Sequence, residues 1–304
     1  MSSFTIHGIC AATHTPFAAD GSLNLAAVEK QRDHLLARKV NQVFIGGSTG
    51  ESHSVSTAER LALAERWMAA AKGTEMRVIV HVGSNNLRDA AELAAHAQKA
   101  GAAAVSMLSP SYFKPRSLAD LIACCEMVAK AAPAIPFYYY DIPVLTGVNF
   151  SMEEFLNTAP ARIPNLAGIK YTNPDLMAYQ LARRGGGGKF DLPWGCDEFY
   201  LAALALGARG AVGSTFNFAP GIYQRLQKAY EAGDMAAAQA EQFRSVQLVQ
   251  VVAKRGYMGS AKALMAHLGL PVGPARLPNA NPDAAGVAAM LKELEAIGYF
   301  SWKD

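Results

Sequence analysis

Near the middle of the chain stands the segment Asn165-Leu-Ala-Gly-Ile-Lys170, followed by Tyr171-Thr-Asn-Pro174. It is typical of a buried β-strand that ends in a lysine and leads into a turn. Buried lysines are rare unless they are paired or used in chemistry. An amine taken out of water loses its proton more readily, and a neutral amine can attack a ketone to form a Schiff base. For this segment alone, the ordinary alternative is favoured: a lysine whose ammonium group reaches solvent.

Strand-like runs of this kind alternate with helical segments along the chain. Eight are predicted, at Gly8–Ala12, Gln42–Gly46, Arg77–Val82, Ala103–Leu108, Pro136–Tyr140, Ala167–Lys170, Lys189–Trp194 and Gly210–Gly213. Ser56 with Glu59 forms a capping box at the start of one helix. At 304 residues, this alternation predicts an α/β fold, a closed (β/α)₈ TIM barrel. An open doubly wound sheet is the alternative, but the segment Cys10-Ala-Ala-Thr-His-Thr-Pro16 lacks the glycine fingerprint expected after its first strand.

The chain continues well beyond the last predicted strand. Four further segments favour helices, namely Ala219–Glu231, Asp234–Lys254, Ser260–Leu268 and Asp283–Gly298. We therefore expect residues 1–232 to form the barrel and residues 233–304 to form a helical C-terminal extension packed on it. These helices are too few to hold a separate core, so the extension is not expected to be an independent domain.

Composition and charge argue against several classes of protein. The chain is 51% hydrophobic and 17% charged, which is typical of a soluble globular protein. Its formal net charge of +3, without a basic block, does not indicate nucleic-acid or membrane partners. No apolar stretch could span a bilayer and residues 1–8 lack a signal-peptide pattern, so we expect a cytoplasmic protein. The four cysteines and the histidines lack metal-ligand spacing, so no metal site and no disulfide framework is expected.

Unusual residues follow five of the predicted strands. They are Gly46-Gly-Ser-Thr-Gly-Glu51, Tyr138-Tyr-Tyr-Asp-Ile-Pro143, Lys170, Trp194-Gly-Cys-Asp-Glu198 and Gly213-Ser-Thr215. In a (β/α)₈ barrel, the chemistry takes place at the carboxyl ends of the strands. Because these ends meet at one rim, we expect the five segments to form a single site there.

Most of these segments also have an ordinary structural explanation. The glycine turn lets the backbone and the hydroxyls of Ser48 and Thr49 approach a small carboxylate. A strand-to-helix turn with capping hydroxyls explains it equally well. Asp197 and Glu198 could accept hydrogen bonds from a polyhydroxylated substrate, or could simply favour the first turn of a helix.

The three consecutive tyrosines differ in what they can do. On a strand, Tyr138 and Tyr140 share one face. Tyr140 ends the strand, so its phenol could reach the mouth of the barrel and exchange protons beside a lysine. Packing within the barrel suits Tyr138 and Tyr139 better.

Four motifs together resemble a known family. They are Gly46-Gly-Ser-Thr-Gly-Glu51, Tyr140-x-Ile-Pro-x-x-Thr-Gly147, Gly168-Ile-Lys170 and Gly213-Ser-Thr-x-Asn217. They resemble the pyruvate-dependent Schiff-base lyases, which include the N-acetylneuraminate lyases and the dihydrodipicolinate synthases. The resemblance implies a covalent imine between a lysine and the substrate. It also implies no metal, no diffusible cofactor, and a homotetramer built as a dimer of dimers.

The resemblance implies a role for each matching residue. Lys170 would form the imine with pyruvate, and Tyr140 would relay the proton. Ser48 and Thr49 would hold the pyruvate carboxylate. Tyr112, in Ser109-Pro-Ser-Tyr-Phe-Lys-Pro115, resembles a tyrosine that reaches into the site of a neighbouring subunit.

Two regions distinguish members of the family. The dihydrodipicolinate synthases resemble Tyr-Asn-x-Pro-x-Arg-Thr-Gly, and Leu145 replaces the arginine that would bind a second carboxylate. The N-acetylneuraminate lyases have an apolar residue there and a Gly-x-Asp-Glu segment, which Gly195-Cys-Asp-Glu198 matches. In them, this segment and the serine that matches Ser214 hold the hydroxyls of the sugar. Thr172 also matches.

The implied activity is the reversible cleavage of N-acetylneuraminate to N-acetylmannosamine and pyruvate. One alternative is an aldolase or dehydratase for another 2-keto-3-deoxy sugar acid, which would use the same Lys170 and Tyr140. Another is a barrel that senses a ligand without catalysis. Asp141 and Cys196 depart from the expected pattern and leave the choice of sugar acid open.

Overall fold

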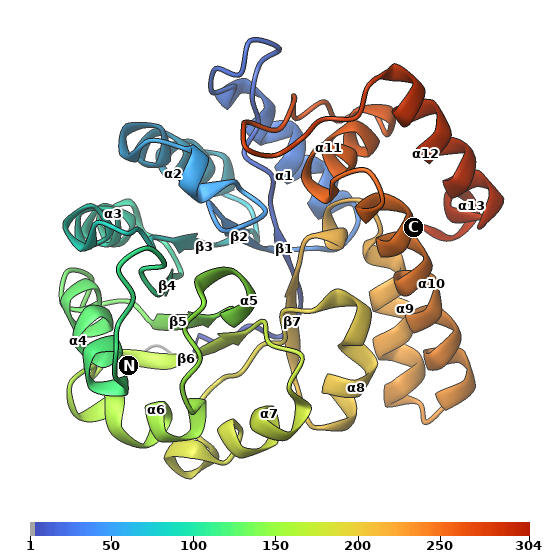
Figure 1. The fold of residues 1–304 in the computed structure, drawn as a ribbon. Helices are drawn as coiled ribbons and strands as arrows, with labels where there is room; N and C mark the ends of the chain where they lie inside the picture. Colours follow the sequence, from blue (N-terminus) through green and yellow to red (C-terminus); the bar gives the residue numbers. More distant parts are fainter. Residues whose placement is uncertain (1–3) are drawn as a thin grey trace.

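A curled sheet of seven parallel strands, surrounded by helices, makes up the centre of the computed structural model, which describes residues 4–304 (Figure 1). The strands are β1 Gly8–Ala12, β2 Gln42–Ile45, β3 Arg77–His81, β4 Ala104–Leu108, β5 Phe137–Asp141, β6 Leu166–Tyr171 and β7 Gly210–Gly213. They pair in the order β6-β5-β4-β3-β2-β1-β7. The predicted α/β fold of TIM-barrel type is confirmed. Residues 1–3, part of the segment in which no signal peptide is expected, lie outside the described range.

The strand predicted at Lys189–Trp194 is wrong. Only isolated bridges form there, joining Asp191 to β6 and Trp194 to both β6 and β7. Pro193 stands between them and has no N–H to donate to a ladder. The Asp191 carbonyl still accepts from an N–H of β6 at 2.9 Å, and the Trp194 N–H donates to a carbonyl of β7 at 2.9 Å. This irregular segment therefore fills the gap between β6 and β7.

The strands are buried on both faces, as expected for a parallel sheet covered by helices. Tyr138 and Tyr140 belong to a cluster with Cys10, Phe44 and other side chains inside the curled sheet. Tyr139 points the other way and packs on Phe155 of a surrounding helix, with ring centroids 5.1 Å apart. The prediction that Tyr138 and Tyr140 share a face is confirmed.

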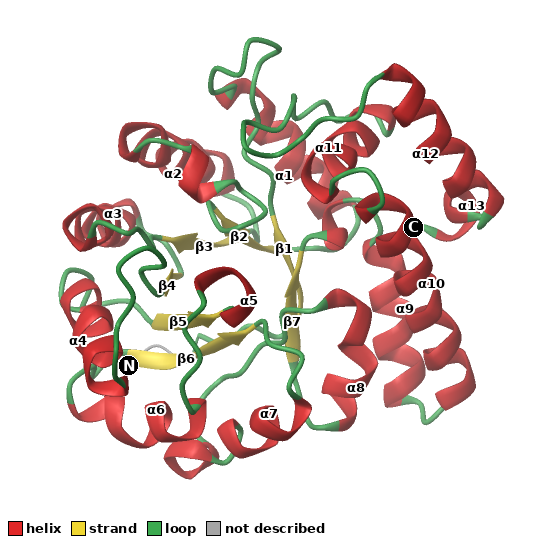
Figure 2. Ribbon diagram, viewed as in Figure 1, coloured by secondary structure: helices red, strands yellow, loops and turns green. Residues whose placement is uncertain are grey.

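Among residues 4–304, nine helices follow or connect the strands up to α9. Eight of them form the outer layer, whereas the short helix α5 (Pro143–Thr146) lies inside the ring (Figure 2). The nine are α1 Val28–Ala37, α2 Thr57–Ala71, α3 Leu87–Ala100, α4 Leu118–Ala129, α5 Pro143–Thr146, α6 Met152–Thr158, α7 Leu176–Ala182, α8 Tyr200–Ala205 and α9 Pro220–Glu231. The capping box at the start of α2 is confirmed. The Glu59 N–H donates to Ser56 Oγ at 3.2 Å, and the Ser56 N–H donates to Glu59 Oε2 at 2.9 Å.

Four helices come after α9, and Figure 1 shows them gathered on one side of the ring. They are α10 Met235–Ala253, α11 Tyr257–His267, α12 Ala284–Ala296 and α13 Tyr299–Trp302. α11 begins three residues before the predicted Ser260, directly after Gly256. The hydroxyl of Tyr299 donates to the carbonyl of Phe218 at 2.7 Å. Across residues 4–304, none of the helices combines the length and hydropathy needed to cross a bilayer.

Candidate functional site

A cavity of about 550 Å³ opens at the carboxyl ends of the strands. Nine of the ten predicted site residues line it, namely Ser48, Thr49, Tyr140, Lys170, Thr172, Gly195, Asp197, Glu198 and Ser214. They come from segments as far apart in the sequence as the turn after β2 and the end of β7. The parallel sheet brings them to one rim, as expected for this fold.

Lys170 lies near the carboxyl end of β6, with only 4% of its surface exposed. Its Nζ atom donates to Thr172 Oγ1 at 3.1 Å. The same nitrogen stands 3.5 Å from the centroid of the Tyr140 ring. The amine therefore ends within the cavity, and the alternative of a side chain that reaches bulk solvent is excluded.

Tyr140 is the neighbour of Lys170 in the register of β5 and β6. Its ring is buried and packs edge-on against Phe44 and His81, each with a centroid separation of 5.8 Å. Its hydroxyl lies 3.3 Å from Ser48 Oγ. The phenol thus joins the amine on β6 to the hydroxyls that follow β2.

The turn after β2 depends on its glycines. Gly46 has a φ of +64°, in the region that favours glycine. A Cβ atom on Gly50 would lie 2.9 Å from the backbone of Gly46, closer than such atoms approach. The chain therefore folds back tightly on itself and places Ser48 and Thr49 at the cavity.

The segment from Gly195 to Glu198 forms the opposite wall. A Cβ atom on Gly195 would stand 1.9 Å from Thr172 Oγ1, so only glycine leaves room for the hydroxyl that holds the Lys170 amine. Asp197 begins a helical turn, as one of its two interpretations predicted. Its Oδ2 accepts the Thr215 N–H at 2.9 Å. Burial raises the pKa of Asp197 to about 6, while the hydrogen bonds from Thr215 oppose this shift.

Four residues of the C-terminal helical region also line the cavity, and none of them was predicted as a site residue: Val249, Tyr257, Met258 and Asn279. Tyr257, the first residue of α11, shares a hydrogen bond of 2.6 Å between its hydroxyl and Ser214 Oγ. Asn279 comes from the loop between α11 and α12. The sequence contains one local indication of where α11 begins, namely Gly256. Its φ of +88° ends the preceding turn and lets the helix start at Tyr257.

Tyr112 is the predicted residue that the structure does not bring to the cavity. Its side chain is 80% exposed and packs edge-on against Phe113, with ring centroids 5.0 Å apart. Its N–H donates to Asn85 Oδ1 at 3.1 Å. A role in the site of a neighbouring subunit stays a prediction.

The two residues that departed from the expected pattern occupy different places. Cys196 lines the cavity, and burial raises the pKa of its thiol to about 12. Asp141 is buried but does not line the cavity, and burial raises its pKa to about 7. Asn173 Nδ2 lies 3.4 Å from Asp141 Oδ2. Within residues 4–304, no three His, Cys, Asp or Glu side chains are grouped so that they could hold a metal ion.

Comparisons with known proteins agree with this geometry. The model of the dihydrodipicolinate synthetase family matches residues 5–296. The chain belongs to this family. The motif resemblance to the pyruvate-dependent Schiff-base lyases is thereby confirmed, and the family match extends into the C-terminal helices.

Within the dihydrodipicolinate synthetase family, the chain is similar to proteins named N-acetylneuraminate lyase. The chicken (Gallus gallus) lyase is 38% identical over 303 residues, which cover 98% of this chain and 97% of the relative. The structure of the Proteus mirabilis lyase superposes with a TM-score of 0.94 at 37% identity and covers 97% of this chain and 100% of that one. The lyase structure from Aliivibrio salmonicida has the same TM-score and identity and covers 97% and 98%.

Proposed function

We propose that the protein is a Schiff-base (class I) aldolase, a carbon–carbon lyase that reversibly cleaves N-acetylneuraminate to N-acetylmannosamine and pyruvate. One observation carries the proposal. The buried amine of Lys170 lies 3.1 Å from a hydroxyl and 3.5 Å from the Tyr140 ring centroid, inside a cavity with the polar groups of a sugar-acid site. The similarity to named N-acetylneuraminate lyases supports the choice of substrate.

In this mechanism the Lys170 nitrogen attacks the keto carbon of the open-chain sugar acid, and water leaves to give an iminium ion. The bond between the carbon next to the iminium carbon and the hydroxyl-bearing carbon beyond it then breaks. Its electron pair forms a carbon–carbon double bond to the iminium carbon as the C=N electrons move to nitrogen, which gives an enamine. The hydroxyl proton on the departing carbon is removed, and that carbon leaves as the aldehyde of N-acetylmannosamine. Protonation of the enamine and hydrolysis of the imine release pyruvate and the free amine. The iminium is the electron sink, so the proposed mechanism uses no metal and no diffusible cofactor.

Tyr140 is the proposed proton relay. Its hydroxyl lies 3.3 Å from Ser48 Oγ, and its ring lies under the Lys170 amine. Ser48 and Thr49 would hold the substrate carboxylate, which places the keto carbon near that amine. A phenol in this position can move a proton directly or through the carboxylate or Thr49.

The far wall suits the sugar. Thr172, Gly195, Asp197, Glu198 and Ser214 would bind its hydroxyls, since carboxylates and hydroxyl oxygens accept hydrogen bonds. Leu145 also lines the cavity and offers no charge for a second carboxylate, which disfavours dihydrodipicolinate synthase activity.

Four further expectations remain part of the proposal. We propose a cytoplasmic homotetramer, built as a dimer of dimers, in which Tyr112 completes a neighbouring site. Exposed apolar side chains at Tyr112 and Phe113 support a contact there. We also propose that residues 233–304 extend the barrel without forming an independent domain. Tyr257 and Asn279 support this, because residues of that region line the cavity.

The first experiment tests for the covalent imine. The protein is incubated with pyruvate and sodium borohydride, and its mass is then measured. We expect one reduced pyruvate adduct per chain, mapped to Lys170 by peptide analysis, because borohydride reduces an imine irreversibly. An unmodified protein would contradict the proposed chemistry and favour the ligand-sensing barrel.

A substrate panel then distinguishes the sister enzymes. N-acetylneuraminate and other 2-keto-3-deoxy sugar acids are supplied in turn, and pyruvate release is recorded. We expect the largest kcat/KM for N-acetylneuraminate. A clearly larger value for another sugar acid would move the assignment to an aldolase or dehydratase for that compound, with Lys170 and Tyr140 unchanged in role.

The pKa of Asp197 gives a prediction for pH. Burial raises it to about 6, so the carboxylate that would accept sugar hydroxyls forms only above that pH. We expect kcat/KM for the sugar acid to fall as the pH decreases through about 6. Asp197→Asn should lower activity and remove this acid limb. Asp141→Asn is the matched control, because Asp141 is also a buried acid but does not line the cavity, so its profile should keep the limb.

The same shift has a consequence for stability. The folded-state pKa of Asp197 lies above the ordinary value of 3.8, so the folded protein binds this proton more tightly. That contribution is present at low pH and is lost as the pH rises through about 6. As the pH rises from 3.8 to about 6, Asp197→Asn should therefore gain thermal stability relative to the wild type. A difference in melting temperature between the two proteins that stays constant over this range would contradict the raised pKa of Asp197.

A further inference from the structure

Glu51 is the last residue of the glycine turn, and the proposed mechanism gives it no role. Its backbone has a φ of +55° and a ψ of +38°, in the left-handed region that residues with a long side chain rarely adopt. Its side chain is completely buried, with 0% exposure. A carboxylate that is buried from water needs ion pairs or hydrogen bonds from its neighbours to remain charged.

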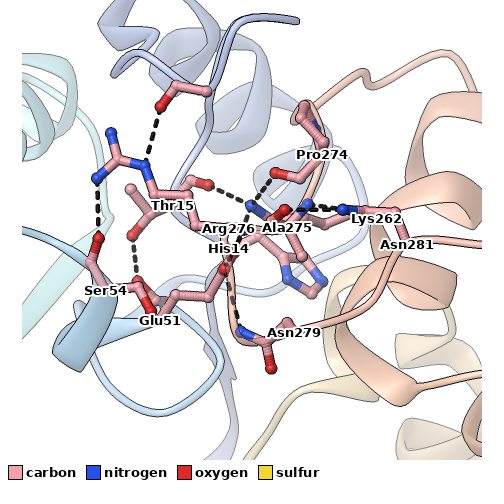
Figure 3. Close-up of polar contacts among 12 residues, drawn as sticks. His14, Thr15, Glu51, Ser54, Lys262, Pro274, Ala275, Arg276, Asn279 and Asn281 are labelled. Carbon is pink, nitrogen blue, oxygen red and sulfur yellow. Dashed lines mark hydrogen bonds and ion pairs between the residues drawn. The ribbon is translucent and has the colours of Figure 1, made fainter.

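Groups from the C-terminal region hold this carboxylate (Figure 3). The Lys262 ammonium on α11 lies 2.6 Å from Glu51 Oε1. The backbone N–H of Arg276 donates to Glu51 Oε2 at 2.8 Å, and Asn279 Nδ2 donates to the same oxygen at 3.3 Å. The glycine turn is thus bound to a part of the chain more than 200 residues away.

Lys262 holds the turn by a second route as well. Its side chain is 1% exposed, and its ammonium donates to the carbonyls of Thr15 at 2.9 Å and Pro274 at 3.1 Å. Thr15 Oγ1 in turn donates to the Gly50 carbonyl at 2.6 Å. Lys262 therefore acts on Glu51 directly and on Gly50 through Thr15. Burial lowers the pKa of Lys262, and the Glu51 carboxylate opposes this shift.

Hydrogen bonds link Glu51 to Ser48 and Asn279, which line the cavity. Its N–H donates to the Ser48 carbonyl at 3.0 Å, which closes the turn that contains Ser48 and Thr49. Ser48 Oγ is the atom 3.3 Å from the Tyr140 hydroxyl. Asn279, which donates to Glu51, lines the same cavity. One buried carboxylate thus sets the position of groups on two walls of the site.

We propose that Glu51 and Lys262 are positioning residues, whose buried ion pair holds the Ser48–Thr49 turn in the conformation that binds the carboxylate of the 2-oxo acid. Neither side chain lines the cavity, so both act through the turn. Stability alone does not explain the pair, because well-packed apolar residues often replace a buried ion pair without loss of stability. This inference rests on the proposed function and deepens it.

The test compares pyruvate binding with stability in the double variant Glu51→Gln/Lys262→Met. Removing both charges avoids leaving one of them buried and unpaired. Adduct formation with borohydride is titrated with pyruvate at a temperature where melting curves show the variant to be folded. We expect the half-saturating pyruvate concentration to rise about tenfold or more, as for other misplaced substrate-positioning groups. Because Lys170 is intact, we expect saturating pyruvate still to give a full adduct.

Glu241→Gln is the matched control. Glu241 on α10 has a side chain only 11% exposed and pairs with Arg225 and Arg244, away from the glycine turn. We expect this variant to melt at a lower temperature with an unchanged half-saturating concentration.

Two results would overturn different parts of the argument. A folded double variant with the half-saturating concentration of the wild type would show that the pair is only structural. If the double variant does not fold, Glu51→Gln alone is titrated and judged by the same criterion. A wild-type protein that forms no adduct would instead contradict the proposed function itself.

Discussion

Replacing Lys170 by alanine is expected to abolish sugar-acid cleavage, with kcat lowered by about 10⁴-fold or more. The nitrogen lost is the one proposed to bond covalently to the substrate. Among residues 4–304, no other lysine lines the cavity to take its place. The loss of turnover should appear in steady-state pyruvate release, and the loss of the borohydride adduct in the mass of the protein. Full activity in this variant would refute the mechanism.

Tyr140→Phe separates imine formation from proton transfer. The ring under the Lys170 amine remains, whereas the hydroxyl 3.3 Å from Ser48 Oγ is lost. We therefore expect a reduced but measurable pyruvate adduct together with a fall in kcat of about 10²- to 10⁴-fold. Lys189→Met is the control for lysine chemistry, because Lys189 is exposed and does not line the cavity, and it should behave as the wild type in both assays.

The sequence predicted much of the barrel for a simple reason. A strand buried on both faces needs an apolar run, and an amphipathic helix needs a regular period, so both leave local patterns. The segment Lys189–Trp194 is an exception, because its last three residues are buried and it bridges to strands on both sides, yet it contains Pro193 and forms no regular strand. A proline cannot donate a ladder hydrogen bond, so Pro193 indicates an irregular connection here and not a central strand.

The site residues at the ends of strands could be predicted from the sequence, whereas those from the C-terminal helices could not. Ser48, Tyr140 and Lys170 follow or end strands, so the topology fixes where they meet. Tyr257 and Asn279 reach the cavity only because the C-terminal helices dock on the rim. That docking depends on tertiary contacts such as the Lys262–Glu51 pair, which no local pattern reveals.

Gly168→Ala is expected to destabilise the protein by about 3 kcal/mol or more, which is large for the addition of one methyl group. A Cβ atom at Gly168 would lie 1.8 Å from the carbonyl oxygen of Asp191 and 2.7 Å from its carbonyl carbon. That oxygen cannot move away freely, because it accepts the Ile169 N–H at 2.9 Å. The Asp191 side chain is fixed too, since it accepts the Tyr138 hydroxyl at 2.9 Å.

Thermal unfolding of Gly168→Ala should therefore show a melting temperature lowered by about 5 °C or more. Gly73→Ala is the control, because its Cβ meets no atom within 4 Å. Its cost should be limited to the strain of a left-handed alanine, about 1 kcal/mol. Equal melting temperatures for the two variants would contradict the steric argument. The expected difference would explain physically why glycine stands two residues before Lys170: the segment that fills the gap between β6 and β7 lies directly against the backbone that carries the amine.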